Sequence, residues 1–97
     1  MPAYLIITAH IHDRERFVSG YGKEAARLVE RFGGEYLLRA PGAQSLEGSH
    51  GDGASVVVSR WPDKAAAIGF WNSPEYAEVK RLRGGIADCN VLLVEAP

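Results

Sequence analysis

Two histidines, His10 and His12, follow a short apolar run near the start of the sequence and are the first side chains that could carry chemistry. Residues two apart on a strand point the same way, so this pair could share a metal ion with a third ligand. His50 lies far along the chain and Asp13 is placed to cap a helix, so we expect no metal site. His10 alone could act as a general base, because an imidazole pKa of about 6.5 suits proton transfer at neutral pH.

Two arginines could bind an anionic group. Arg39 lies in the run Glu35 to Ala40, and its planar guanidinium suits a carboxylate or an enolate, with a salt bridge to Glu47 as the simpler alternative. Arg83 falls at the end of the last predicted helix, where it could bind an acidic ligand or a partner subunit. Its simpler role is to stabilise the negative C-terminus of that helix. We take His10 and Arg39 as candidate catalytic residues.

Trp71 and Tyr76 flank the point where a predicted helix breaks and restarts. Aromatic rings with a polar atom often line a pocket between a helix and a sheet. Both are therefore candidate substrate-binding residues, together with Arg83. Helical spacing equally favours packing of these rings in the core.

Cys89 is the only cysteine of the sequence. No CxxC partner and no cation beside it in the sequence would lower its pKa, so we expect a buried, inert thiol. It can form no internal disulfide, which favours a reducing, cytoplasmic location. The glycines match no phosphate-binding spacing, and no cofactor is expected.

Six predicted elements must position these side chains, in the order strand, helix, strand, strand, helix, strand. The predicted strands are Ala3 to His10, Glu35 to Ala40, Ser55 to Trp61 and Asn90 to Glu95. The predicted helices run from the Asp13 cap to Phe32 and from Asp63 to Arg83, the second restarting at Ser73-Pro74. Gly33-Gly34 should end the first helix through a positive φ at Gly34. This order predicts an α+β, ferredoxin-like βαββαβ fold with an antiparallel sheet and both helices on one face.

The other face of that sheet needs a cover. The first and last strands are apolar at both parities, as in Tyr4 and Leu5 or Leu92 and Leu93, so helices on one side leave half of these side chains exposed. A second copy packed sheet to sheet would bury them. We therefore expect a homodimer.

Length and charge restrict the function further. The 97 residues fit one domain, covering residues 1–97. The 11 basic and 12 acidic residues give a net charge of −1, so no nucleic-acid-binding surface is expected. No apolar run approaches the roughly 20 residues that span a bilayer, so no membrane partner is expected either.

Several blocks of the sequence are similar to one family. They are Phe32-Gly33-Gly34-Glu35-Tyr36-Leu37-Leu38-Arg39, Trp61-Pro62, Phe70-Trp71 and Ser73-Pro74-Glu75-Tyr76. Over nearly its whole length the chain resembles the family called domain of unknown function 1330. The resemblance implies a dimeric α+β barrel, in which two ferredoxin-like protomers join their sheets. Relatives in that superfamily include cofactor-free monooxygenases, haem-degrading enzymes, lactone isomerases and ligand-sensing modules, so it implies no single activity.

Three functions stay open at this point. The first is a dimer that binds a small organic, aromatic or acidic molecule, with cofactor-free proton transfer or oxygenation by His10 as base. Arg39 or Arg83 would then stabilise the developing negative charge. The second is a non-catalytic ligand-binding or interaction dimer, which the lack of a close catalytic constellation favours. The third is haem or metal binding through His10 and His12.

Overall fold

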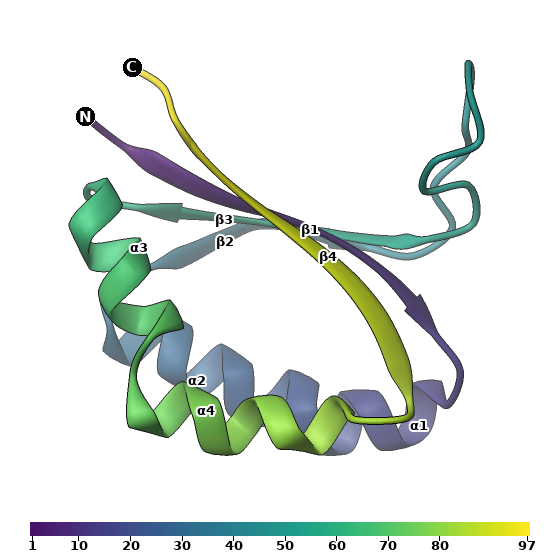
Figure 1. Ribbon diagram of the computed structural model, residues 1–97, viewed down its shortest axis with the longest axis horizontal. Helices are drawn as coiled ribbons and strands as arrows, with labels where there is room; N and C mark the ends of the chain where they lie inside the picture. The colour runs from purple at the N-terminus through teal and green to yellow at the C-terminus, as the bar shows by residue number, and fades with distance from the viewer.

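The computed structural model describes residues 1–97 and contains one four-stranded antiparallel sheet with its helices on a single face (Figure 1). The strands are β1 (Ala3–Ile11), β2 (Glu35–Ala40), β3 (Ser55–Trp61) and β4 (Ala87–Glu95). They lie in the order β2-β3-β1-β4. The predicted α+β, ferredoxin-like fold is therefore confirmed. The last strand begins at Ala87, earlier than predicted, because all nine residues of β4 pair with β1.

The helical segments follow the predicted order. They are α1 (Arg14–Arg16), the π-helical segment η1 (Phe17–Gly22), α2 (Lys23–Arg31), α3 (Lys64–Trp71), α4 (Pro74–Lys80) and the 3₁₀ turn η2 (Arg81–Arg83). Asp63 and Ser73 cap α3 and α4, each through a side-chain oxygen that accepts a backbone N–H three residues ahead. No helix has both the length and the apolar character needed to cross a membrane.

The first predicted helix is continuous but not uniform. Asp13 caps α1 by accepting a bond from the backbone N–H of Arg16 at 3.1 Å, as expected from the sequence. The chain then widens into η1 before it returns to α-helical geometry in α2. A π turn holds more residues than an α turn and is frequent at functional sites. This widened stretch covers one end of the sheet.

The end of α2 depends on two glycines in different ways. Gly33 has a φ of 92°, the left-handed conformation that glycine adopts at a helix end. The prediction that Gly34 supplies the positive φ is therefore wrong by one residue. Gly34 is required for another reason, because a Cβ there would lie 2.7 Å from Cζ2 of Trp61.

Alternation along the strands divides the sheet into two faces. On β1, the odd-numbered residues face the helices and the even-numbered residues face away from them. The antiparallel registers place residues of β3 and β4 on the same face as their partners, as in Ile7 with Val57 and Val91. The face without helices is called the open face below. It carries apolar side chains from all four strands, among them Ile6, Leu38, Val58, Leu92 and Val94.

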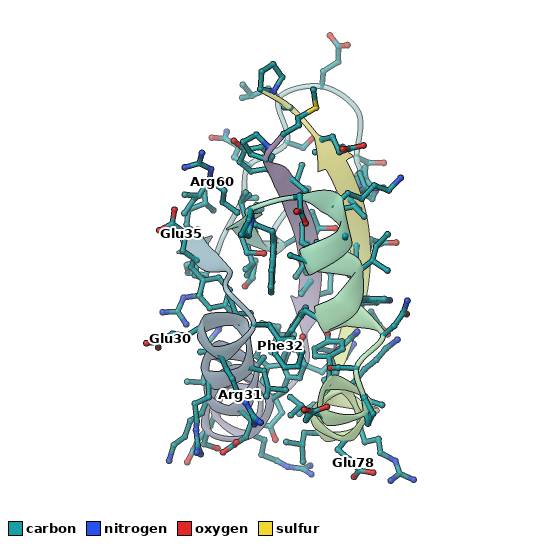
Figure 2. The ribbon with its side chains drawn as sticks, turned by 90° about the vertical axis from the view of Figure 1, so that its left-hand side faces the viewer. Glu30, Arg31, Phe32, Glu35, Arg60 and Glu78 are labelled. Atoms are coloured by element: carbon teal, nitrogen blue, oxygen red, sulfur yellow. The ribbon has the colours of Figure 1, made fainter.

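The core lies between the sheet and the helices α2, α3 and α4. Trp61 is 1% exposed, and its ring centroid lies 4.8 Å from that of Phe70. Phe32 points into the space between the helices (Figure 2) and meets Phe70 edge to face at 5.9 Å. This aromatic group fills one end of the space between sheet and helices, and it is called the packed end below.

Candidate functional site

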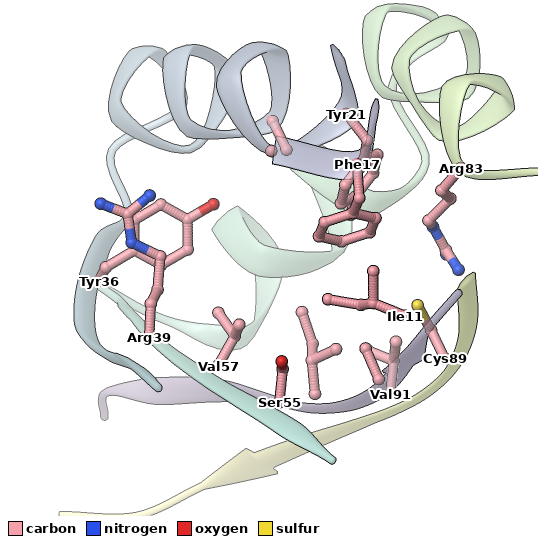
Figure 3. Close-up of a pocket in the computed structure, with 14 residues that line it drawn as sticks. Ile11, Phe17, Tyr21, Tyr36, Arg39, Ser55, Val57, Arg83, Cys89 and Val91 are labelled. Carbon is pink, nitrogen blue, oxygen red and sulfur yellow. The ribbon is translucent and has the colours of Figure 1, made fainter. Parts of the chain in front are cut away.

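The opposite end of the same space contains a pocket of about 80 Å³. Its floor is formed by β1, β3 and β4, and its roof by η1 and the start of α2 (Figure 3). Ten of its 14 lining residues are hydrophobic. Small residues explain why it is hollow: Ala9, Gly22, Ala25 and Ser55 stand where larger side chains would fill the volume.

Two arginines line this apolar pocket on opposite sides (Figure 3): Arg39 from β2, which is exposed, and Arg83 from η2, which is half-buried. Arg39 lies 4.4 Å over the ring of Tyr36, and Arg83 lies 5.4 Å over the ring of Tyr21. Neither arginine takes part in a salt bridge, and no carboxylate lines the pocket. The pocket therefore carries positive charge that the chain does not neutralise.

Arg83 has a further unsatisfied group. Its Nε is buried and has no hydrogen-bond partner. A buried donor without an acceptor costs about 1–3 kcal/mol, so most such groups in proteins are paired. An anionic oxygen in the pocket is a chemically suitable acceptor for an N–H of this kind.

The phenol groups of the pocket are poor proton acceptors at neutral pH. Burial, followed by the neighbouring phenol of Tyr76, raises the pKa of Tyr21 far above its usual value. Burial also raises the pKa of Tyr36, although Arg39 opposes the shift. Both side chains remain neutral hydrogen-bonding groups, and the Tyr21 hydroxyl is 2.7 Å from that of Tyr76.

Cys89 differs in part from the sequence-based expectation. A cation does lie near it, because the guanidinium of Arg83 ends beside its sulfur (Figure 3). Burial nevertheless raises the pKa of the thiol, and Arg83 only partly offsets that effect. Cys89 is therefore a neutral thiol in the pocket wall, as expected of an inert cysteine.

The structure brings together only part of the residues selected from the sequence. Arg39 and Arg83 both line the pocket. The alternative salt bridge from Arg39 to Glu47 does not form. His10 is exposed on the open face, opposite Asp88 in register, and thus on the far side of the sheet from the pocket.

The two aromatic candidates lie behind or beside the pocket. Tyr76 is 2% exposed and lies behind the pocket wall, where its hydroxyl is 2.7 Å from that of Tyr21 and its side chain also interacts with Arg83. Trp71 lines a different hollow, with its ring centroid 5.0 Å from that of Tyr76 and 4.8 Å from Lys80 Nζ. Asp88 Oδ2 accepts a hydrogen bond from His12 Nε2 at 2.8 Å, and no three potential metal ligands converge anywhere in the chain.

Phe17, Tyr21 and Cys89 also line the pocket, although none of them was a site candidate from the sequence. Phe17, Tyr21 and Ala25 recur at four-residue spacing, which places them on one face of a helix. That shared face was a local signal for one wall of the pocket. The position of Cys89 beside Arg83 depends on the tertiary fold and has no local signal.

A model of the family Domain of unknown function (DUF1330) matches residues 2–97. The chain belongs to this family. The match confirms the resemblance seen in the sequence blocks and covers both halves of the sheet and the whole pocket. No curated protein matches the chain in sequence.

Solved structures share the fold of this DUF1330 chain at low sequence identity. A protein of unknown function from Rhodopseudomonas palustris is 18% identical, with a TM-score of 0.80 over 99% of this chain and 82% of that one. A dimeric ferredoxin-like protein of unknown function from Jannaschia sp. CCS1 is 13% identical, with a TM-score of 0.76 over 99% and 100%. SnoaB, a cofactor-independent oxygenase from Streptomyces nogalater, is 15% identical, with a TM-score of 0.71 over 99% and 93%. At these identities the likeness shows the fold alone.

Proposed function

We propose that this protein binds a small, largely apolar organic anion in the pocket beneath η1. One observation carries the proposal: two arginines without a carboxylate partner, Arg39 and Arg83, line a mostly apolar pocket that contains no carboxylate. Charge is attracted most strongly where water is displaced, so an anion in this pocket gains more than one on the surface. The planar guanidinium forks suit a carboxylate, a phenolate or an enolate.

Matched acidic and neutral ligands test the proposal. Phenylacetate should raise the melting temperature, whereas phenylacetamide, which has a similar shape without the charge, should not. Arg83→Gln should remove the shift. Arg81→Gln is the matched control, because Arg81 is exposed two residues away and pairs with Glu78 at 3.3 Å. Equal shifts from acid and amide, or none from either, would contradict the proposal.

A second candidate is cofactor-free oxygenation of the bound anion, and the fold shared with the cofactor-independent oxygenase SnoaB favours it. In such a reaction the substrate anion supplies the electrons and O₂ is the oxidant. Addition of O₂ to the carbanion carbon forms a C–O bond and gives a peroxide anion, which takes a proton from solvent to become a hydroperoxide. Loss of water then breaks the O–O bond and the C–H bond of the same carbon, and leaves a carbonyl group. Arg39 and Arg83 would stabilise the anion, and the acidic proton of the substrate would leave to solvent, because Tyr21 and Cys89 hold their own protons.

Oxygen uptake separates the two candidates. A panel of quinols and enolisable ketones should consume O₂ at a rate that depends on the protein and is lost in Arg83→Gln. Binding without O₂ consumption or conversion of any panel member supports the non-catalytic alternative. His10→Ala should leave the rate unchanged, because His10 lies on the other face of the sheet.

The open face supports a homodimer as the assembled state. Leu92 is 64% exposed there on the edge strand β4, which also carries Val94, and Leu38 is 45% exposed on the opposite edge strand β2. A second copy would remove this surface from water, and a stable interface needs about 800 Å² from each protomer. The Jannaschia neighbour is described as dimeric.

Sedimentation equilibrium tests the dimer. The wild-type protein should have twice the chain mass, and Leu92→Asp should produce a monomer. Leu82→Asp is the control, since Leu82 is 47% exposed on η2, away from the open face. A cytoplasmic location and the absence of nucleic-acid binding stay predictions from the sequence.

A further inference from the structure

A wider hollow of about 770 Å³ opens directly from the pocket. The two share wall residues, among them Phe17, Gly22, Arg39 and Val57. The wider hollow is called the mouth below. Arg39 stands at the boundary, since it lines both the pocket and the mouth, whereas Arg83 lines the pocket alone.

The mouth has its own concentration of positive charge. Arg14, Lys23 and Arg39 line it, and no aspartate or glutamate does. None of the three takes part in a salt bridge, although the chain forms four such pairs elsewhere. Arg14 is held in place by a bond from its Nη2 to the hydroxyl of Ser55 at 2.8 Å. This bond orients a guanidinium toward the mouth without neutralising it.

Three like charges around one hollow repel one another, and the net charge of the whole chain is −1. The basic character of the mouth is therefore local and not a property of the surface in general. Such a group attracts an anion and increases its rate of association. Together with the buried, unpaired Nε of Arg83 at the far end, it gives the site two separate positively charged ends with apolar walls between them.

We propose that the natural ligand carries two anionic groups on an apolar body, one held by Arg83 inside the pocket and the other by Arg14, Lys23 and Arg39 at the mouth. This inference rests on the proposed function, because it names the class of anion that the same site binds. The ligand class is a compact dianion, such as an aromatic dicarboxylate or a carboxylated phenolate. A monoanion would satisfy only one end.

Calorimetric titration with two matched ligands tests the inference. Phenylacetate has one carboxylate, and 1,4-phenylenediacetate has one at each end of the same ring. The diacid should bind about tenfold more tightly, because its second carboxylate forms charge-assisted hydrogen bonds at the mouth that phenylacetate cannot form. Raising the salt concentration should reduce this advantage, because the mouth is open to solvent.

Variants assign each carboxylate to its end. Lys23→Gln should lower the affinity for the diacid several-fold and leave the affinity for phenylacetate unchanged, whereas Arg83→Gln should lower the affinity for both acids. Arg16→Gln is the matched control, because Arg16 lies on the same helix but lines neither hollow.

The outcomes separate the two proposals. If phenylacetate binds and the diacid binds no more tightly, the two-anion inference fails while the proposed function stands. An equal loss of affinity for both acids in Lys23→Gln would also overturn the two-anion inference, because it would show that Lys23 attracts any anion electrostatically and does not bind the second carboxylate. If neither acid binds, both proposals fail.

Discussion

The two ends of the space between the sheet and the helices are built on the same strands but differ in the size of the side chains that fill them. At the packed end, β1 and β3 contribute Leu5 and Trp61, both almost completely buried. At the pocket end, the same two strands contribute Ala9 and Ser55, which leave the volume between sheet and roof unfilled. Figure 1 shows that α3 covers the first end, while α1 and η1 cover the second.

This difference separates stability from binding within one small fold. The packed end buries large apolar surfaces, which supply most of the free energy of folding. The pocket end tolerates a cavity, a π-helical segment and an unpaired buried N–H, each of which costs stability. Substitutions at the packed end should therefore change the free energy of unfolding, and those at the pocket end should mainly change ligand affinity.

The largest effect is expected from Trp61→Ala at the packed end. Removing a side chain that is 1% exposed should lower the free energy of unfolding by about 3–5 kcal/mol. Urea denaturation followed by circular dichroism measures the change. Val57→Ala removes a smaller side chain from the pocket wall. If Trp61→Ala lowered the free energy of unfolding no more than Val57→Ala does, the conclusion that the packed end supplies most of the stability would be wrong.

Gly34→Val should have the next largest effect. Its Cβ would come within 2.7 Å of the Trp61 ring, which is rigidly packed, so we expect a loss of about 1–3 kcal/mol. Gly69→Ala is the matched control, because a Cβ at Gly69 meets no atom within 4 Å. An unchanged urea midpoint for Gly34→Val would show that Trp61 can move aside.

Tyr21→Phe should cost less, about 1 kcal/mol at neutral pH, because it removes one hydroxyl bond to Tyr76. Its clearer signature is in alkali. Because the folded-state pKa of Tyr21 is raised, its stabilising contribution is complete below about pH 10, the ordinary value for tyrosine, and declines as the pH rises above it.

Urea midpoints measured from pH 7 to pH 11 test this sign. The wild-type protein should lose stability above pH 10, and Tyr21→Phe should lose less over the same range. Tyr4→Phe, on the open face, should behave like the wild type. A steeper alkaline loss in Tyr21→Phe would contradict the assignment.

The smallest effect on stability is expected from Ala9→Leu in the pocket. The added atoms enter an existing cavity, so the free energy of unfolding should change by less than about 1 kcal/mol. The shift in melting temperature caused by phenylacetate should nevertheless disappear. Retained binding in this variant would move the ligand site away from the pocket.

The fold was predictable from local signals. Helix caps and strand alternation depend on residues that are close together in the sequence. The helices capped by Asp13, Asp63 and Ser73 begin where they were expected. The site was predictable only in part, because a cavity depends on which faces meet. Arg39 could be selected by residue type, but the face occupied by His10 follows from strand register and parity.

The contacts of Arg83 with Cys89 and Tyr21 join residues that are distant in sequence or lie on different elements, so no spacing rule identifies them. The position of Gly34 against Trp61 is of the same kind, since it joins a helix end to the last residue of β3. The parts of the site that the sequence did not predict therefore depend on tertiary contacts between residues that are far apart in the chain.

The π-helical segment makes the pocket sensitive to a one-residue change in chain length. Deleting one residue between Phe17 and Gly22 would let the helix return to regular α geometry, because a π turn holds one residue more than the α-helical hydrogen-bond pattern needs. The residues on either side would keep their orientation, because a π turn accommodates one additional residue without rotating the flanking α-helix. A gain or loss of one residue in this stretch would therefore change the width of the pocket roof and leave the packed end as it is.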